Sequence, residues 1–215
     1  MGTFKAHIEG IRGDFSAQAF DFDNNEIYTF QDHNKVVLGA GRLIARMLAS
    51  YTQGWNPGSY NLGITKFVLF GIDPLVTSPD CNSQMLAGDF SNYYDALNPV
   101  TLDQITTTAF PCLLSADSIE VSTVPVNSCD ELTTPTTDGS SVMSSDTSNN
   151  MTQICVRIGP GYVSTGNRKY YAMAALVGRT SESSDLNEYV IALEQFPVMI
   201  KTPAVTFRFS WTVYI

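Results

Sequence analysis

The C-terminal segment of this 215-residue chain alternates between apolar and polar side chains without interruption. The apolar set occupies the odd-numbered positions: Val205, Phe207, Phe209, Trp211, Val213 and Ile215. Successive side chains of a β-strand point to opposite faces of its sheet, so this pattern predicts a strand with one buried face. Such a strand has to pair with others and have its apolar face covered, which points to a fold with a β-sheet core.

Further segments have the composition of strands and are separated by turn residues. Short strands are expected at residues 4–11, 19–22, 26–30, 118–124 and 153–158, with turns at Gly13-Asp14 and Asp23-Asn24-Asn25. The mainly apolar run 64–71 predicts a central strand covered on both faces, and 170–177 and 189–193 predict buried strands. We therefore expect a mainly β protein, with an antiparallel β-sandwich or jelly-roll-like core in a single domain over residues 1–215.

Three segments depart from this pattern. From Asn34 to Tyr51 the apolar residues recur at three- and four-residue steps, which predicts one amphipathic helix. Residues 73–115 contain several prolines and no sustained period, so we expect a long excursion there. Residues 127–152 are low in complexity and predict a loop insertion, whose stretch 133–150 forms an exposed tip between two strands.

The charge of the chain narrows the classes of partner. Charged residues make up 15% of the sequence, below the usual quarter, and the formal net charge is −9. Binding to a phosphate backbone depends on Lys and Arg, so direct contact with nucleic acid is disfavoured. The sequence has no apolar run of membrane-spanning length, and its first residues lack the pattern of a secretory signal, so we expect neither membrane insertion nor Sec export.

The sequence contains few motifs that are typical of catalytic or ligand-binding sites. The nucleophile motif GxSxG is absent, and no Ser or Cys motif accompanies the two histidines, His7 and His33, which we expect to be structural or exposed. We predict no catalytic, metal or cofactor site, although carboxylates brought together by folding remain an alternative. Asp21 to Asn25 offers oxygen ligands as in a calcium loop, but Glu26 stands where that loop needs glycine, so an Asx-rich turn is favoured.

The cysteines match no zinc-binding pattern. Cys81, Cys112, Cys129 and Cys155 are widely spaced along the chain, without a CxxC pair. We expect them to be reduced and buried, with a bridge between Cys112 and Cys129 as the alternative in an oxidising medium.

Three segments together resemble small structural proteins of tailed bacteriophages. The first is the predicted helix at 38–49, with Gly41-Arg42 followed by an apolar stripe. The second is the run 64–71 with the turns Asp73-Pro74 and Ser78-Pro79-Asp80, and the third is the closing strand 209–215 around Trp211. The chain departs from the family at Phe70 to Asp73, where a Gly-Thr-Gly type of turn is usual, and residues 81–152 match no part of it.

The resemblance implies a virion component with a β-sandwich-like core, assembled in the host cytoplasm. We expect a non-enzymatic, multi-copy structural protein of the neck, tail or capsid surface, whose partners are other virion proteins and copies of itself. The alternatives are a fibre or tail domain that binds a receptor or host glycan, and a virion-associated glycan hydrolase.

The low charge and the apolar content of the excursion favour a contact between subunits. The excursion is too apolar for disorder, and its interface candidates are Phe90, Tyr93, Tyr94, Leu97, Phe110 and Leu113. Loop aromatics could also stack on a sugar, anchor a partner or simply pack; these are Trp55, Tyr60, Tyr93, Tyr94 and Tyr162.

Overall fold

The computed structural model of the chain describes residues 12–36, 63–72, 100–105, 113–121, 140–146, 151–164, 166–179 and 188–214. These ranges hold nine β-strands, a three-residue helix α4 (Leu102–Gln104) and a 3-10 turn η3 (Pro160–Tyr162). The strands are β1 (Arg12–Phe20), β2 (Glu26–Val36), β3 (Gly63–Ile72), β4 (Leu113–Glu120), β5 (Ser140–Asp146), β6 (Met151–Ile158), β7 (Lys169–Arg179), β8 (Glu188–Lys201) and β9 (Thr206–Tyr214).

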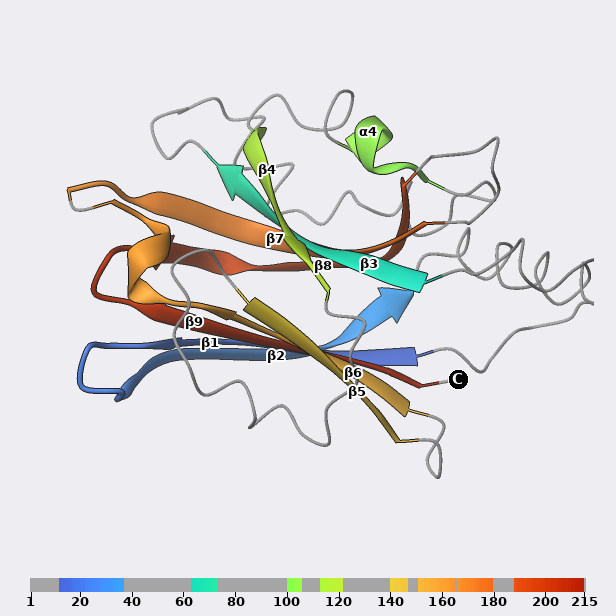
Figure 1. Cartoon of the computed structure of the whole chain (residues 1–215), viewed down its shortest axis with the longest axis horizontal. Helices are drawn as coiled ribbons and strands as arrows, with labels where there is room; N and C mark the ends of the chain where they lie inside the picture. The colour runs from blue at the N-terminus through green and yellow to red at the C-terminus, as the bar shows by residue number, and fades with distance from the viewer. Residues whose placement is uncertain are drawn as a thin grey trace, which may run out of the picture.

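The strands form a β-sandwich of two antiparallel layers, as the sequence predicted (Figure 1). One layer, here called the β3 sheet, has the order β4-β3-β7-β8. The other, the β9 sheet, has the order β2-β1-β9-β6-β5. The layers are joined because β2, which pairs with β1 along its length, also pairs with β8 through Lys35 and Val36.

The main hydrophobic core lies between the two sheets and is built around β9. Phe207, Phe209, Trp211 and Val213 are buried, and Val205 packs against the same core, so the predicted apolar face is confirmed for these residues. The Trp211 ring meets the ring of Phe15 edge-on, with 4.9 Å between their centroids. Ile215 lies outside the described residues.

A second hydrophobic cluster covers the opposite face of the β3 sheet. Val68 and Phe70 of β3 are fully buried there, while Phe67 and Leu69 face the main core. The segment around α4 contributes Val100 and Ile105 to this cover. The run 64–71 is therefore a strand that is buried on both faces from Phe67 to Phe70, as its apolar sequence predicted, whereas residues 64–66 are half-buried.

Tertiary pairing overrides local signals near the N-terminus. The predicted turn at Gly13-Asp14 is wrong, because both residues belong to β1 and pair with β2 on one side and β9 on the other. The start predicted for the amphipathic helix is also wrong, because 34–36 belong to β2. The rest of that helix, 37–51, and the predicted strand 4–11 lie outside the described residues.

The two predicted insertions contain regular structure. Leu113 to Ser115, assigned to the excursion, form the start of β4, and α4 also lies within that range. The loop prediction is wrong for 140–146, which form edge strand β5 paired with β6. A backbone ladder does not depend on large side chains, so a serine-rich segment can form an edge strand that periodicity alone does not reveal.

Cys155, in β6, is part of a disulfide bond, and its partner lies outside the described residues. The expectation of reduced cysteines is therefore wrong for Cys155. Its side chain is buried, and it pairs across the ladder with Ser210 of β9. Spacing along the chain did not reveal this bond, because the fold decides which cysteines meet.

Candidate functional site

The outer face of the β9 sheet carries polar side chains in register. Asp14 and Ser16 alternate with the core residues Phe15 and Ala17 on β1, so they point away from the core. The ladder aligns His33, Asp14, Thr212 and Gln153 in one row across four strands. Gln31, Ser16, Ser210 and Cys155 form the next row.

A hollow of about 520 Å³ lies over these two rows. Its lining consists of Asp14, Phe15, Ser16, Gln31, Asp32, His33, Ser210 and Thr212. The hollow therefore offers carboxylate, amide, imidazole and hydroxyl groups, with Phe15 the one apolar residue among them.

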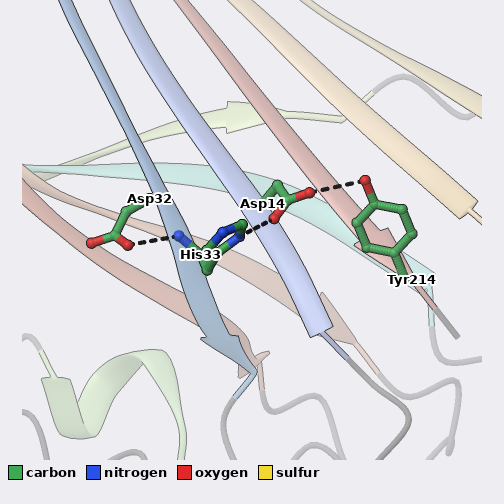
Figure 2. Close-up of polar contacts among 4 residues, drawn as sticks. All are labelled: Asp14, Asp32, His33 and Tyr214. Atoms are coloured by element: carbon green, nitrogen blue, oxygen red, sulfur yellow. Dashed lines mark hydrogen bonds and ion pairs between the residues drawn. The ribbon is translucent and has the colours of Figure 1, made fainter.

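Asp14 holds the polar groups at one end of the hollow together (Figure 2). Its Oδ1 lies 2.6 Å from Nδ1 of His33, the residue directly opposite it on β2. Its Oδ2 accepts a hydrogen bond of 2.9 Å from the hydroxyl of Tyr214, which lies two residues beyond Thr212, the partner of Asp14 on β9. Asp32 accepts a 2.7 Å hydrogen bond from the backbone N–H of His33. Three neighbouring strands thus position a single carboxylate.

The pair of Asp14 and His33 lies at the surface of the sheet. The His33 side chain is 93% exposed, and ion pairs with that exposure contribute little to stability. Within the described ranges its polar contacts are with Asp14 and Asp32, and no hydroxyl nucleophile is bonded to it. Both oxygens of Asp14 are engaged by side chains of the same sheet, which holds the carboxylate in one orientation.

Sequence reasoning allowed for an exposed His33 but missed its place within β2 and its partners. His33 is exposed, as expected, and His7 lies outside the described residues. The signal that could have found the hollow is the alternation of Asp14, Ser16 and Gln18, which the interpretation of Gly13-Asp14 as a turn concealed.

The predicted interface residues are not tested by this part of the molecule. Phe90, Tyr93, Tyr94, Leu97 and Phe110 lie outside the described residues. Leu113 begins β4 and pairs with Ile72 of β3. Among the loop aromatics, Tyr162 lies in η3 and packs against the main core, with Lys169 Nζ 5.1 Å from its ring centroid. Packing therefore accounts for Tyr162, and the other loop aromatics lie outside the described residues.

A second polar cluster joins β4 to β7. Asp117 accepts hydrogen bonds from the Tyr171 hydroxyl and, at 2.8 Å, from Lys169 Nζ. Burial, together with the bond to Asp117, raises the pKa of Tyr171. Because Tyr171 is fully buried in the main core, this cluster is a structural link between an edge strand and the sheet interior.

The turn at Asp21 to Asn25 uses its oxygens internally. Both carboxylate oxygens of Asp21 accept hydrogen bonds from Asn25, and these bonds lower the pKa of Asp21. The prediction of an Asx-rich turn is confirmed. In the part of the chain that the structure describes, no three His, Cys, Asp or Glu side chains are grouped to hold a metal ion.

Comparisons with known proteins add nothing to the geometry of the hollow. No family model, curated protein or solved structure matches the chain. The described helices include none that is long and apolar enough to cross a membrane.

Proposed function

We propose that the chain is a structural protein of a tailed bacteriophage virion. It is non-enzymatic and present in many copies, and it mediates contacts between subunits in the neck or tail or on the capsid surface. Its partners are other virion proteins and copies of itself. The resemblance at 38–49, 64–80 and 209–215 favours this class, and the rigid sandwich is compatible with it.

The observation that carries the proposal is the outer face of the β9 sheet. The described side chains of four adjacent strands, β2, β1, β9 and β6, include mainly hydroxyl and amide groups on this face. Neutral polar groups cost less to desolvate than charged groups and can form hydrogen bonds across a contact. Gln153, for example, donates a 2.8 Å hydrogen bond to the hydroxyl of Ser210, which shows how such a face satisfies its own polar groups.

The predicted contact surface of the excursion extends this proposal. Phe90, Tyr93, Tyr94, Leu97, Phe110 and Leu113 remain the candidates for a second, more apolar contact. In an assembled particle we expect residues 73–115 to bury at least about 800 Å² per subunit, the scale of one side of a standard interface.

The direct test is the composition of purified particles. Virions of the phage that encodes the chain are banded on a density gradient, and the chain is quantified by mass spectrometry against the major capsid protein. We expect a fixed ratio corresponding to several copies per particle, and immunogold labelling at one site. A chain that stays in the soluble lysate fraction and never co-bands with particles would contradict the proposal.

A second candidate function, binding of a host-surface glycan, is favoured by the hollow beside Asp14. Its carboxylate, amide and hydroxyl groups match the donors and acceptors of a neutral sugar. The described lining has no exposed Phe, Tyr or Trp ring on which a sugar could stack, which is why this function comes second.

A glycan array followed by calorimetry separates the two functions. If the hollow binds sugar, Asp14→Asn should weaken binding at least about tenfold, because a charged acceptor is replaced by a neutral one. The control is Ser118→Ala, which changes an exposed side chain on the other sheet. Absence of binding to any glycan at millimolar concentration would remove this candidate.

A further inference from the structure

The tip of the β1–β2 hairpin carries the most exposed large apolar side chain in the described part of the chain. Phe22 is 87% exposed, and Ile27, at the start of β2, is 56% exposed. The hairpin lies at one end of the sandwich, where β1 and β2 connect (Figure 1). Single exposed apolar residues are common on protein surfaces, but two beside one turn form a local apolar projection.

The turn that carries Phe22 is held in one conformation. The backbone N–H of Asp21 donates to Asn25 O at 2.9 Å, and the N–H of Asn24 donates to Asp21 O at 3.1 Å. The Asp21 carboxylate accepts two further bonds from Asn25, of 2.8 and 3.1 Å. Asn24 has a φ of 62°, a left-handed conformation that asparagine tolerates better than most residues.

Arg208 of β9 ties this turn to the sheet. Its Nη2 donates a 3.4 Å hydrogen bond to Asn24 Oδ1, and its guanidinium lies 4.4 Å from the ring centroid of Phe20. Binding of a partner to Phe22 therefore costs little conformational entropy, because the turn is already ordered in the free protein. Nothing in the fold requires Phe22 to be apolar, because its side chain projects into solvent.

The sequence neighbours of the projection are acidic, while Arg208 lies at the base of the turn. Asp21 and Asp23 flank Phe22 directly, and Glu26 precedes Ile27. Asp21 has a lowered pKa because of its bonds to Asn25, so it remains charged at neutral pH. An apolar centre with an acidic rim complements an apolar pocket with a basic rim.

We propose that this hairpin tip inserts Phe22 into an apolar, Lys- and Arg-rimmed pocket on a different protein. Charge argues against the other occupants: a second copy of a chain with net charge −9 and an anionic lipid surface would both repel the acidic rim. The proposal deepens the proposed function, and rests on it, by naming the surface that attaches the subunit to its neighbour in the particle.

The first test measures incorporation into particles. A phage lacking the gene is complemented with wild type, Phe22→Ser, or the control Val198→Ser, which alters an exposed apolar residue of β8. Melting of each purified variant checks folding, and we expect melting temperatures within about 2 °C of wild type for exposed substitutions. Phe22→Ser should reduce copies per particle at least about tenfold, as for a hot-spot residue, whereas Val198→Ser should not.

The outcomes separate the two proposals. Wild type absent from particles overturns the proposed function, whereas wild type and folded Phe22→Ser present in equal amounts overturn only the role of the hairpin. Asp23→Lys should reduce incorporation about three- to tenfold if the pocket rim is basic, because it reverses one interfacial charge. If the Asp23→Lys variant is incorporated as well as wild type, the partner pocket does not have a basic rim.

Photocrosslinking identifies the protein that contacts Phe22 in the particle. Benzoylphenylalanine in place of Phe22 is activated in intact particles, and crosslinked peptides are sequenced by mass spectrometry. A crosslink to another particle protein, at a segment with apolar and basic residues, supports the proposal. Crosslinks to a second copy of the chain, to lipid alone, or to nothing would each overturn it.

Discussion

The two sheets of the sandwich bury their side chains in different ways. The β9 sheet has apolar core residues on one face and mainly polar side chains on the other, so apolar and polar residues alternate along β9, although Thr206 and Thr212 of the polar face are also buried. The β3 sheet is covered on both faces, by the β9 sheet on one side and by the residues around α4 on the other. Consequently β3 has five consecutive buried residues, from Phe67 to Gly71.

This difference assigns separate roles to the layers. Side chains on the outer face of the β9 sheet lie outside the main core, and most of those that line the Asp14 hollow are at least partly exposed. The β3 sheet has no equivalent free face along Phe67 to Phe70, because Val68 and Phe70 are sealed by the second cluster. Function on a sheet face is therefore expected at the Asp14 hollow, whereas the β3 sheet supplies stability.

The largest expected effect tests the one-sided burial of the β9 sheet. Trp211→Ala should lower the free energy of unfolding by about 3–5 kcal/mol, the usual cost of truncating a large buried aromatic. Trp211→Phe keeps a ring and removes an indole N–H that has no hydrogen-bond partner among the described residues, so it should cost less than about 1.5 kcal/mol. Urea denaturation of both variants checks this, and a Trp211→Ala protein as stable as wild type would contradict it.

The second prediction tests the two-sided cover of the β3 sheet. Ile105 is fully buried in the second cluster, so Ile105→Ala should cost about 2–4 kcal/mol in chemical denaturation. Ser118→Ala, an exposed change on β4 of the same sheet, should stay within about 0.5 kcal/mol of wild type. Equal stability of the two variants would show that the outer cover of this sheet is dispensable.

The third prediction concerns the buried end of β8. Lys201 is buried, and its Nζ donates a 2.7 Å hydrogen bond to Thr202 O, without an ion-pair partner among the described residues. Burial lowers the pKa of Lys201 to about 8, so the unfolded chain binds the proton more tightly than the folded chain. Burial of the charge therefore destabilises the fold below pH 8, and this cost disappears as pH rises toward the unfolded value.

Comparison with Lys201→Met isolates this titration from that of other groups. Between pH 7 and pH 9.5, wild type should gain about 2 kcal/mol in unfolding free energy relative to Lys201→Met. Denaturation curves of both proteins at several pH values measure the difference. A constant difference over that pH range would indicate that Lys201 keeps an ordinary pKa.

The smallest expected effect concerns α4, which helps to cover the β3 sheet. The Thr101 hydroxyl accepts a 3.3 Å hydrogen bond from Gln104 N, and the Gln104 side chain accepts one of 2.9 Å from Thr101 N. Loss of this capping box in Thr101→Ala should cost about 1 kcal/mol in thermal or urea unfolding. Thr101→Ser keeps the hydroxyl and should retain most of that stability; if it loses as much as Thr101→Ala, the cap is not the cause.

Hydrophobic periodicity predicted those strands in which either one face or both faces are buried along a run of residues. The alternation from Val205 to Val213 and the apolar run 64–71 each correspond to a strand in the predicted environment, because the side-chain period follows directly from which faces are covered. The turn at Asp23 to Asn25 was also predictable, since its hydrogen bonds are local.

Local signals failed where long-range pairing decides the structure. Gly13-Asp14 has turn composition but lies in a strand between two partners, and Ser140 to Asp146 has loop composition but forms an edge strand. The candidate site was missed for the same reason. Its residues come from β1, β2 and β9, whose register is not encoded in any one segment.

The sequence by itself determined that this chain is a β protein with a buried C-terminal strand, because a repeating hydrophobic pattern suffices to specify which face is covered. Only the tertiary structure decided that Asp14 lies opposite His33 and within reach of Tyr214, and that Cys155 joins a disulfide bond. Those contacts depend on strand order and register. Both arise from the packing of the whole sandwich and cannot be recognised from the periodicity of any one segment.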